Sequence, residues 1–553
     1  MKKILFLFAI AFTVISCGNK NTESAYIPKD AVGVMYMNLG SLSEKSKDVD
    51  FKNLSIVKMM EENAPQDFKK FMDENLTKEN LEATFRNDFI LGFMKMGNRM
   101  SGSGGLIIPI QSAAAFEKMI APAVEKIPSS DKQENVGKGD AFTVYANKEM
   151  AFGYNEQTAL VVFSSNGFAG QELIDLTNLE ASENITATDY FKGFFDADQD
   201  MGMHITSTPV ADMASPMVSS MSGLKVDLKN NNFVYHTTFE EDRLYASMKL
   251  LLNDDLKSLI GYDSWMATGY DANLLNMMPN NPAVAMKMSM DLPAMYKHVE
   301  SLQDNKVLPE MIRKQLKMSL ETANKQLEGM TGMTVLDIAG IFEGTMMVAL
   351  TEGKTVKDSI RTYNYDDGPE FKVFEKKMPY MYAAVSIKDM KKFEELVGMA
   401  MMMSRPQTKG KNYYQMSDDA FVLLKGNALF ITNDESKADE VYNNGKLASN
   451  LSGFEHKSKL DNSMYIYSAS GATSMFSDMI TGMNPYASMY GNDMGVDDTY
   501  KMMSEYFGDS HMIMNADGLE AYTYMKGEGN SLENMIAYIN AMTEQSMKMM
   551  ARF

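Results

Sequence analysis

Methionine is the residue type whose number and spacing first point to chemistry. The 553 residues include 54 methionines, and Met475, Met479 and Met483 recur at every fourth position, which places them on one helical face. Thioether sulfur is a soft ligand that favours Cu(I). Further candidate donors are the stretch Met201–His204 and the pair His511-Met512. The methionines are spread over the whole chain, so the sequence favours a use as core filler, with copper binding and oxidant scavenging as alternatives.

Three alternating carboxylates form the second candidate site. Asp196, Asp198 and Asp200 precede Gly202, as carboxylates do in calcium loops. Such loops place glycine at the sixth position and glutamate at the twelfth, whereas here Gly202 is seventh and the twelfth residue is Ser207. The three aspartates are weak metal candidates, and a polar turn before a strand is the favoured interpretation.

Catalytic patterns are missing from the sequence. Its five histidines stand far apart, and neither a zinc signature nor a nucleophile elbow nor a phosphate-binding loop occurs. We therefore predict no catalytic residue, no metal and no cofactor, and a binding or scaffolding role. An envelope hydrolase acting on carbohydrate or peptide is the alternative, because its two catalytic carboxylates can lie far apart in sequence.

An aromatic cluster marks the best candidate for ligand recognition. Tyr363, Tyr365 and Phe371 lie close together in "RTYNYDDGPEF", inside residues 353–379. The corresponding stretch earlier in the chain is only "GNRMSGSGG", so 353–379 is interpreted as an insertion. We predict a recognition loop there, and a surface excursion without a role is the alternative.

The elements that would position these residues occur twice. Stretches of similar pattern follow one another in the same order at Pro28 and Pro279, Phe89 and Ile341, Ala159 and Ala428, Met248 and Met525, and Leu256 and Leu532. An ordered series of matches indicates tandem duplication. We predict two α+β copies, residues 27–268 and 269–553, each a largely antiparallel sheet with helices packed on one face. A groove between the copies would be a place for a ligand.

The N-terminus predicts export and attachment to a membrane. Lys2 and Lys3 precede an apolar run that is too short to span a bilayer, so residues 1–16 are interpreted as a signal peptide. "VISC" resembles the lipobox of bacterial lipoproteins, which implies cleavage before Cys17 and acylation of its thiol, with palmitate among the acyl groups. Residues 17–26 would be the lipidated cysteine and its tether. An ordinary signal peptide beside an incidental cysteine is the alternative.

Cysteine count and charge limit the partners. Cys17 is the only cysteine, so the exported chain forms no internal disulfide. The net charge of −20 argues against nucleic acid, which rewards clustered Lys and Arg. The predicted partners are the membrane, through the lipid on Cys17, and an unknown envelope or extracellular ligand.

The opening of the mature chain resembles a known family. The lipobox, the brief tether, "YIPKDAVGVMYMNLGSLSEKS" and the duplicated body are similar to an uncharacterised family of lipid-anchored envelope proteins of Gram-negative bacteria. The resemblance implies the fold and the location and carries no activity. Because Gly18 is not the aspartate that commonly retains lipoproteins at the inner membrane, we expect the outer membrane. Whether the body faces the periplasm or the outside stays open.

Overall fold

The chain forms two compact units that interleave along the sequence. The computed structural model describes residues 23–63, 77–97, 101–124, 132–137, 141–191, 193–195, 199–364, 368–404, 406–472, 475 and 496–550. Unit 1 comprises Met1–Ser222, Val226–Asn253 and Glu528–Ala551, and unit 2 comprises Gly223–Lys225, Asp254–Gly527 and Arg552–Phe553. Each unit combines an antiparallel sheet with helices, which confirms the α+β class. The repeat boundary at residues 268 and 269 stays a prediction, because these units are defined by contacts and not by sequence similarity.

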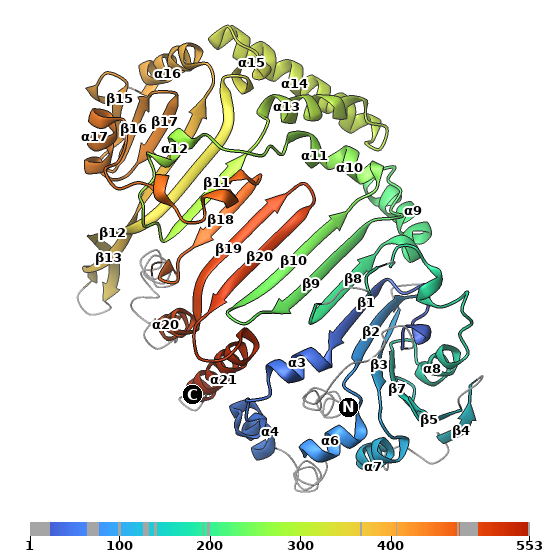
Figure 1. The fold of residues 1–553 in the computed structure, drawn as a ribbon. Helices are drawn as coiled ribbons and strands as arrows, with labels where there is room; N and C mark the ends of the chain where they lie inside the picture. Colours follow the sequence, from blue (N-terminus) through green and yellow to red (C-terminus); the bar gives the residue numbers. More distant parts are fainter. Residues whose placement is uncertain are drawn as a thin grey trace. The chain divides into compact units, whose positions relative to one another are not determined.

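The described residues of unit 1 form ten strands, all paired antiparallel, in the order β4-β5-β6-β7-β3-β2-β1-β8-β9-β10 (Figure 1). Their bounds are β1 Gly33–Asn38, β2 Phe89–Met96, β3 Gly102–Pro109, β4 Lys132–Val136, β5 Phe142–Ala146, β6 Met150–Tyr154, β7 Thr158–Ser164, β8 Met201–Thr206, β9 Asn232–Phe239 and β10 Arg243–Leu251. The central β1 brings β2 and β8 together from distant parts of the sequence.

The helices of unit 1 come from both ends of the chain. They are α3 Leu39–Lys45, α4 Ser55–Asn63, α6 Lys78–Thr84, α7 Ala113–Val124, α8 Ala169–Thr177, α9 Ala211–Ser222 and α21 Ser531–Met550. The C-terminal α21 packs on α3, α4 and β10. Hydrogen bonds fix this packing: Ser55 Oγ donates to Glu544 at 2.7 Å, and Ser531 Oγ donates to the Glu240 carbonyl at 2.7 Å.

Helices cover both faces of part of the unit 1 sheet, so the prediction of helices on one face is wrong. Side chains of successive strand residues point to opposite faces. In β7, Leu160 and Val162 pack in the core that contains Leu173 of α8, whereas Val161 packs in the core that contains Phe116 of α7. The continuous apolar run "ALVVF" is the sequence pattern of a strand buried on both faces.

Unit 2 repeats the strand order of unit 1, as β14-β15-β16-β17-β13-β12-β11-β18-β19-β20. Their bounds are β11 Val284–Ser289, β12 Phe342–Asn364, β13 Gly368–Ile387, β14 Gln407–Gly410, β15 Tyr413–Ser417, β16 Ala420–Lys425, β17 Ala428–Thr432, β18 Met464–Ser468, β19 Phe507–Asn515 and β20 Gly518–Met525. The β19–β20 hairpin turns at Asp517-Gly518, as this strong two-residue turn signal predicts.

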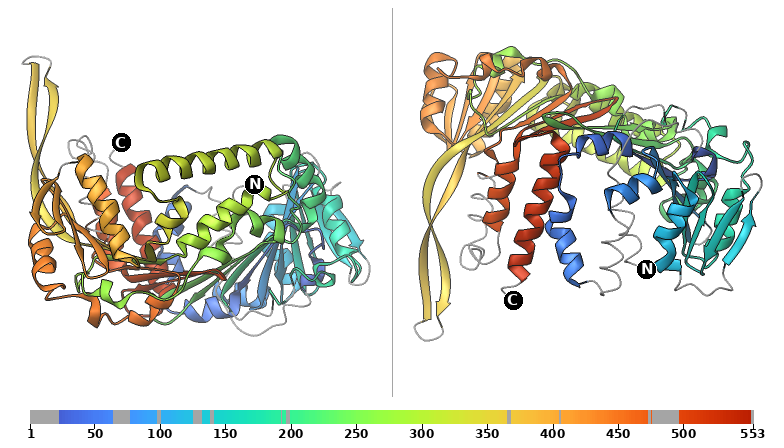
Figure 2. Two further views of the ribbon diagram at one scale, coloured as in Figure 1. Left: turned by 90° about the horizontal axis from the view of Figure 1, so that it is seen from above. Right: turned by 60° about the horizontal axis from the view of Figure 1, so that its bottom comes forward.

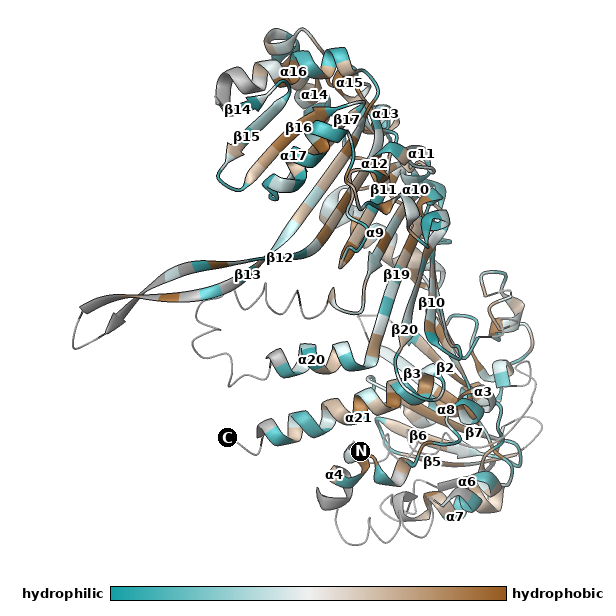
Figure 3. Ribbon diagram, turned by 60° about the vertical axis from the view of Figure 1, so that its left-hand side comes forward, coloured by the Kyte–Doolittle hydropathy of each residue, from teal (hydrophilic) through white to brown (hydrophobic). Residues whose placement is uncertain are grey.

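The helices of unit 2 also lie on both sides of its sheet. They are α10 Asp254–Ile260, α11 Tyr262–Trp265, α12 Ala272–Leu275, α13 Leu292–Ser301, α14 Glu310–Thr331, α15 Val335–Ala339, α16 Met390–Ser404, α17 Glu435–Asn444 and α20 Val496–Tyr506. Helix α17 packs on β16 through Ala438 and Val441, and its other face is polar, so it appears teal beside the brown strand in Figure 3. Phe393 of α16 belongs to a separate core with Ile387 and Leu424.

The insertion 353–379 forms a two-stranded arm. Strands β12 and β13 continue their pairing beyond the other strands, from Lys354 opposite Met378 to Asn364 opposite Gly368. The register shifts between Thr351 and Lys354, where the arm begins, and the arm is the long twisted ribbon that leaves the sheet in Figure 2. The described part of the predicted loop therefore forms a two-stranded ribbon.

Candidate functional site

A methionine repeat of period two runs through the central strands of both sheets. It consists of Met35 and Met37 in β1, Met94 and Met96 in β2, Met201 and Met203 in β8, Met286 and Met288 in β11, and Met512 and Met514 in β19. Because side chains alternate along a strand, both methionines of each pair point to the same face of their sheet.

In unit 1 the register gathers five of these methionines on one face. Met35 pairs directly with Met203, Met37 pairs with Met201, and Met94 lies opposite Gly33. A Cβ added at Gly33 would lie 2.8 Å from Met94 Cε, so the glycine leaves room for that side chain. Directly paired residues share a face, and we name these five residues the unit 1 methionine face.

In unit 2 the register forms a straight row of methionines across four adjacent strands. Met288 of β11 pairs with Met346 of β12 on one side and with Met464 of β18 on the other, and Met464 pairs with Met514 of β19. We name these four residues the methionine row. Met286 and Met512 lie on the same face, two positions along their strands.

These methionines lie outside the hydrophobic cores. Met35 is 38% exposed, Met94 43% and Met512 37%, whereas Tyr36 and Lys287, which point to the opposite faces, are each 1% exposed. Methionine is flexible and polarisable, and surfaces rich in it adapt to varied apolar partners. The other methionines of the unit 1 methionine face and of the methionine row are half-buried. We call the unit 1 methionine face, and in unit 2 the methionine row with Met286 and Met512, the methionine faces. They are partly open apolar surfaces with soft sulfur ligands.

The use of methionine as core filler accounts for only part of the excess. Among the described residues the buried methionines are Met119, Met150, Met277, Met278, Met333, Met347, Met475 and Met525. The strongly exposed ones are Met35, Met94, Met96, Met213, Met217, Met221, Met311, Met318, Met330, Met381, Met416 and Met512. Met475 of the predicted helical series is buried, and Met479 and Met483 lie outside the described residues.

The carboxylate of Asp200 is buried and is hydrogen-bonded to other residues of unit 1. Its carboxylate accepts hydrogen bonds from Lys45 Nζ at 2.6 and 2.9 Å, from Ser41 Oγ at 2.5 Å and from the Phe239 backbone N–H at 2.6 Å, and it is 2% exposed. Asp196 and Asp198 lie outside the described residues. The residues that the structure describes contain no group of three or more His, Cys, Asp or Glu that could hold a metal ion.

His204 and His511 do not lie on the same sheet faces as the neighbouring methionines. His204 and His511 follow or precede a methionine of β8 and β19, and alternation points each histidine to the face opposite that methionine. The fold brings together two histidines that are distant in sequence, since the ring centroids of His456 and His511 lie 4.4 Å apart. Tyr465 is hydrogen-bonded to His511 Nδ1 at 2.7 Å, so this cluster is a packed part of the unit 2 interior.

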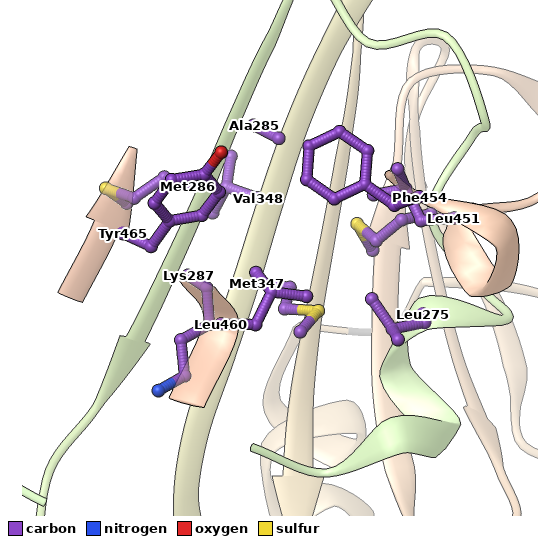
Figure 4. A pocket seen from close by; sticks show the side chains of 11 residues that line it. Leu275, Ala285, Met286, Lys287, Met347, Val348, Leu451, Phe454, Leu460 and Tyr465 are labelled. Atoms are coloured by element: carbon purple, nitrogen blue, oxygen red, sulfur yellow. The ribbon is translucent and has the colours of Figure 1, made fainter. Parts of the chain in front are cut away.

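A small apolar cavity surrounds the stem of a buried lysine in unit 2. Lys287 lies between apolar side chains that include Met347, Leu460 and Tyr465, as Figure 4 shows, and its Nζ donates to the Asn462 carbonyl at 2.5 Å. Burial lowers the pKa of Lys287 to about 8, and nearby Asp461 opposes this shift. The cavity offers about 10 Å³, room for roughly one water molecule. The residues that line this cavity include no carboxylate.

The arm carries part of the predicted aromatic cluster. Phe371 and Val373 are 67% and 66% exposed and point to the same face of β13, opposite Arg361 and Ser359 of β12. The backbone of Tyr363 pairs with Pro369 next to the tip, its side chain lies outside the described part, and Tyr365 is not among the described residues. Phe371 and the backbone of Tyr363 lie near the outer end of the described part of the arm.

Sequence reasoning missed the methionine faces, although a signal was present. The pattern Met-x-Met recurs in five stretches of the sequence that form strands in the structure. A period of two places both methionines of a pair on one face, and only the pairing of distant strands brings the pairs of each unit onto a common face.

Comparisons with known proteins add little. No protein-family model matches the chain, and no curated protein matches it. A solved structure described as "Structure of crystal form I of TP0453" aligns with 43% of this chain and 84% of that chain, at 10% sequence identity and a TM-score of 0.23. A likeness at this TM-score supports no conclusion about fold or function. Among the described helices, none has the length and apolar character needed to cross a membrane.

Proposed function

We propose that this chain is a lipid-anchored envelope protein and that its methionine faces bind apolar ligands. Its role would be binding without catalysis. The observation that carries the proposal is the register that lines up Met-x-Met strands on one open face of each sheet. Contiguous exposed apolar surface marks binding sites. Acyl chains and apolar peptide segments are the chemical classes that such a surface accommodates.

The tandem duplication is part of this proposal. The matching order of the described strands in the two units supports two copies of one ancestral domain. The equivalent strands β1 and β11 both carry Met-x-Met, and the buried position between the two methionines holds Tyr36 in one copy and Lys287 in the other. The copies would thus share the open surface and differ in their interior.

Location and anchoring are proposed from the sequence. The lipobox around Cys17 supports acylation there, and Gly18 supports the outer membrane as the destination. Glu23 begins the described chain and is buried, six residues after Cys17. Residues 23–26 of the predicted tether 17–26 are therefore part of the folded unit 1. The six residue steps from Cys17 to Glu23 span at most roughly 22 Å, which would hold unit 1 close to the membrane surface.

Binding to a fluorescent fatty acid tests the methionine faces. The full chain with Cys17→Ser is titrated with the probe and followed by fluorescence anisotropy. The variant Met35→Lys/Met512→Lys should bind about tenfold more weakly or worse, because ligand binding would desolvate an unpaired ammonium group.

A matched control comes from helix α14. Met318 is 62% exposed and lies on that helix, so Met318→Lys should leave probe binding unchanged. Equal affinity of the double variant and the wild type would contradict the assignment of the methionine faces.

Docking of a protein partner on the arm is a second candidate function. A two-stranded ribbon exposes backbone groups on both edges, and partners can add a strand to such an edge. The exposure of Phe371 and Val373 favours this function, because aromatic and branched side chains anchor interfaces.

Crosslinking in intact cells tests the arm. A photoreactive amino acid at position 371 should give a defined adduct, and the change Val373→Ala should reduce its yield. Position 357 serves as the control, since Lys357 also lies on the arm and pairs with Glu375 at 3.9 Å. Adducts of equal yield at both positions would argue against specific docking through Phe371.

A further inference from the structure

The methionine row of unit 2 has the composition and geometry of a soft-metal site. Met346, Met288 and Met464 stand directly side by side on three adjacent strands. Adjacent strands lie about 4.8 Å apart, so the outer two strands are separated by roughly 10 Å with Met288 between them. Because methionine has three rotatable bonds, the two outer thioethers can turn inward above the central one.

The surroundings of the row favour a soft monovalent cation over harder metals. The residues that share its face and flank it in register are apolar: Met286, Val348, Ile466, Met512 and Leu519. Zn²⁺ is bound by thiolate, imidazole and carboxylate ligands, whereas thioethers favour Cu(I). All row residues are half-buried, so a bound cation would be shielded from competing water while the face stays accessible.

We propose that Met346, Met288 and Met464 bind Cu(I), or Ag(I) as its redox-inert analogue, with Met514 next to them as a fourth thioether. Binding requires no change in oxidation state and no proton release, because thioethers are neutral ligands. The chain contains no cysteine other than Cys17, so its body can bind such a cation only with thioether or imidazole ligands.

Methyl NMR with Ag(I) tests the site directly. The full chain carrying Cys17→Ser is labelled with ¹³C at the methionine methyl groups and titrated with silver nitrate. The signals of the four row methionines should move together and reach saturation at a common silver concentration. The signals of Met311 and Met330, exposed on α14, should stay in place over the same range.

Replacement of the central ligand provides the decisive comparison. Met288→Leu removes one sulfur and keeps an apolar side chain of similar volume, so folding should be retained. Its Ag(I) affinity should fall by about tenfold or more, whereas Met311→Leu should titrate like the wild type. If Met288→Leu lowers the thermal midpoint, Met464→Leu serves as the second variant.

Two results would overturn the site: row signals that do not respond to Ag(I), or Met288→Leu that binds Ag(I) as tightly as the wild type. The outcome is separate from that of the apolar-ligand proposal. The fatty acid is titrated into the wild-type chain in a separate experiment, so a chain that binds Ag(I) and not the fatty acid would contradict the apolar-ligand proposal alone.

Discussion

Replacing Asp200 with alanine should lower the free energy of unfolding by about 3 kcal/mol. The carboxylate is buried and accepts hydrogen bonds from Lys45, Ser41 and the Phe239 backbone. Its removal leaves a buried N–H without a partner and the Lys45 ammonium, which is 27% exposed, without its counter-charge. Urea unfolding followed by circular dichroism measures the loss.

An exposed ion pair supplies the control for Asp200. Asp212 pairs with Lys229 at 2.7 Å on the surface of unit 1, and Asp212→Ala should leave the unfolding midpoint unchanged. The experiment also tests the calcium interpretation of the aspartates. If added Ca²⁺ stabilised the wild type and not Asp200→Ala, Asp200 would act as a metal ligand. The assignment of its carboxylate to internal hydrogen bonds alone would then be wrong.

Replacing Lys287 with methionine should raise the free energy of unfolding by up to about 3 kcal/mol at neutral pH. Burial lowers the pKa of Lys287 to about 8, against its usual 10.5. Below pH 8 the lysine is protonated in both the folded and the unfolded states, so the full cost of its buried charge is present. Between about pH 8 and 10.5 the unfolded chain binds more protons than the folded chain, so wild-type stability should rise with pH.

Trp265 fluorescence measures this effect, because the only tryptophan lies in unit 2 with Lys287. Urea unfolding is repeated from pH 7 to 9, below most of the titration of tyrosine, whose usual pKa is about 10. The stability advantage of Lys287→Met should shrink across that range, and Lys314→Met, on exposed helix α14, should show no such trend. A constant difference between Lys287→Met and the wild type would mean that the lysine does not titrate in this window.

Local patterns predicted much of the fold. The sequence of β9, "NFVYHTTF", has the alternation typical of a strand, the Asp517-Gly518 pair is typical of a hairpin turn, and the apolar run of β7 is typical of a buried strand; the structure has all three elements at these positions. The sequence analysis did not predict helices on both faces of the sheet. Strand β7 lies inside the sheet because it pairs with β3 on one side and β6 on the other, and these pairings are not visible in the local sequence. The arm was predicted only in part for the same reason. The sequence showed an insertion at 353–379, but it did not show that the insertion continues the β12–β13 pairing.

The candidate surface depended still more on non-local pairing. Met35 and Met203 are far apart in sequence and adjacent in the sheet, and a shift of one residue in either strand would have sent one of them to the interior. Lys287 illustrates the converse. Its strand places it on the buried face, where the Asn462 carbonyl is available, and no local feature of "AVAMKMSM" indicates this.

Photo-crosslinking with a diazirine fatty acid, followed by peptide mass spectrometry, tests the central claim most directly. The account predicts that labels concentrate on peptides from β1, β8, β11 and β19, and that Met35→Lys/Met512→Lys removes the labels on β1 and β19. Labels confined to α14 or to the arm, or spread evenly over exposed apolar residues, would contradict the assignment of the methionine faces as the binding surface.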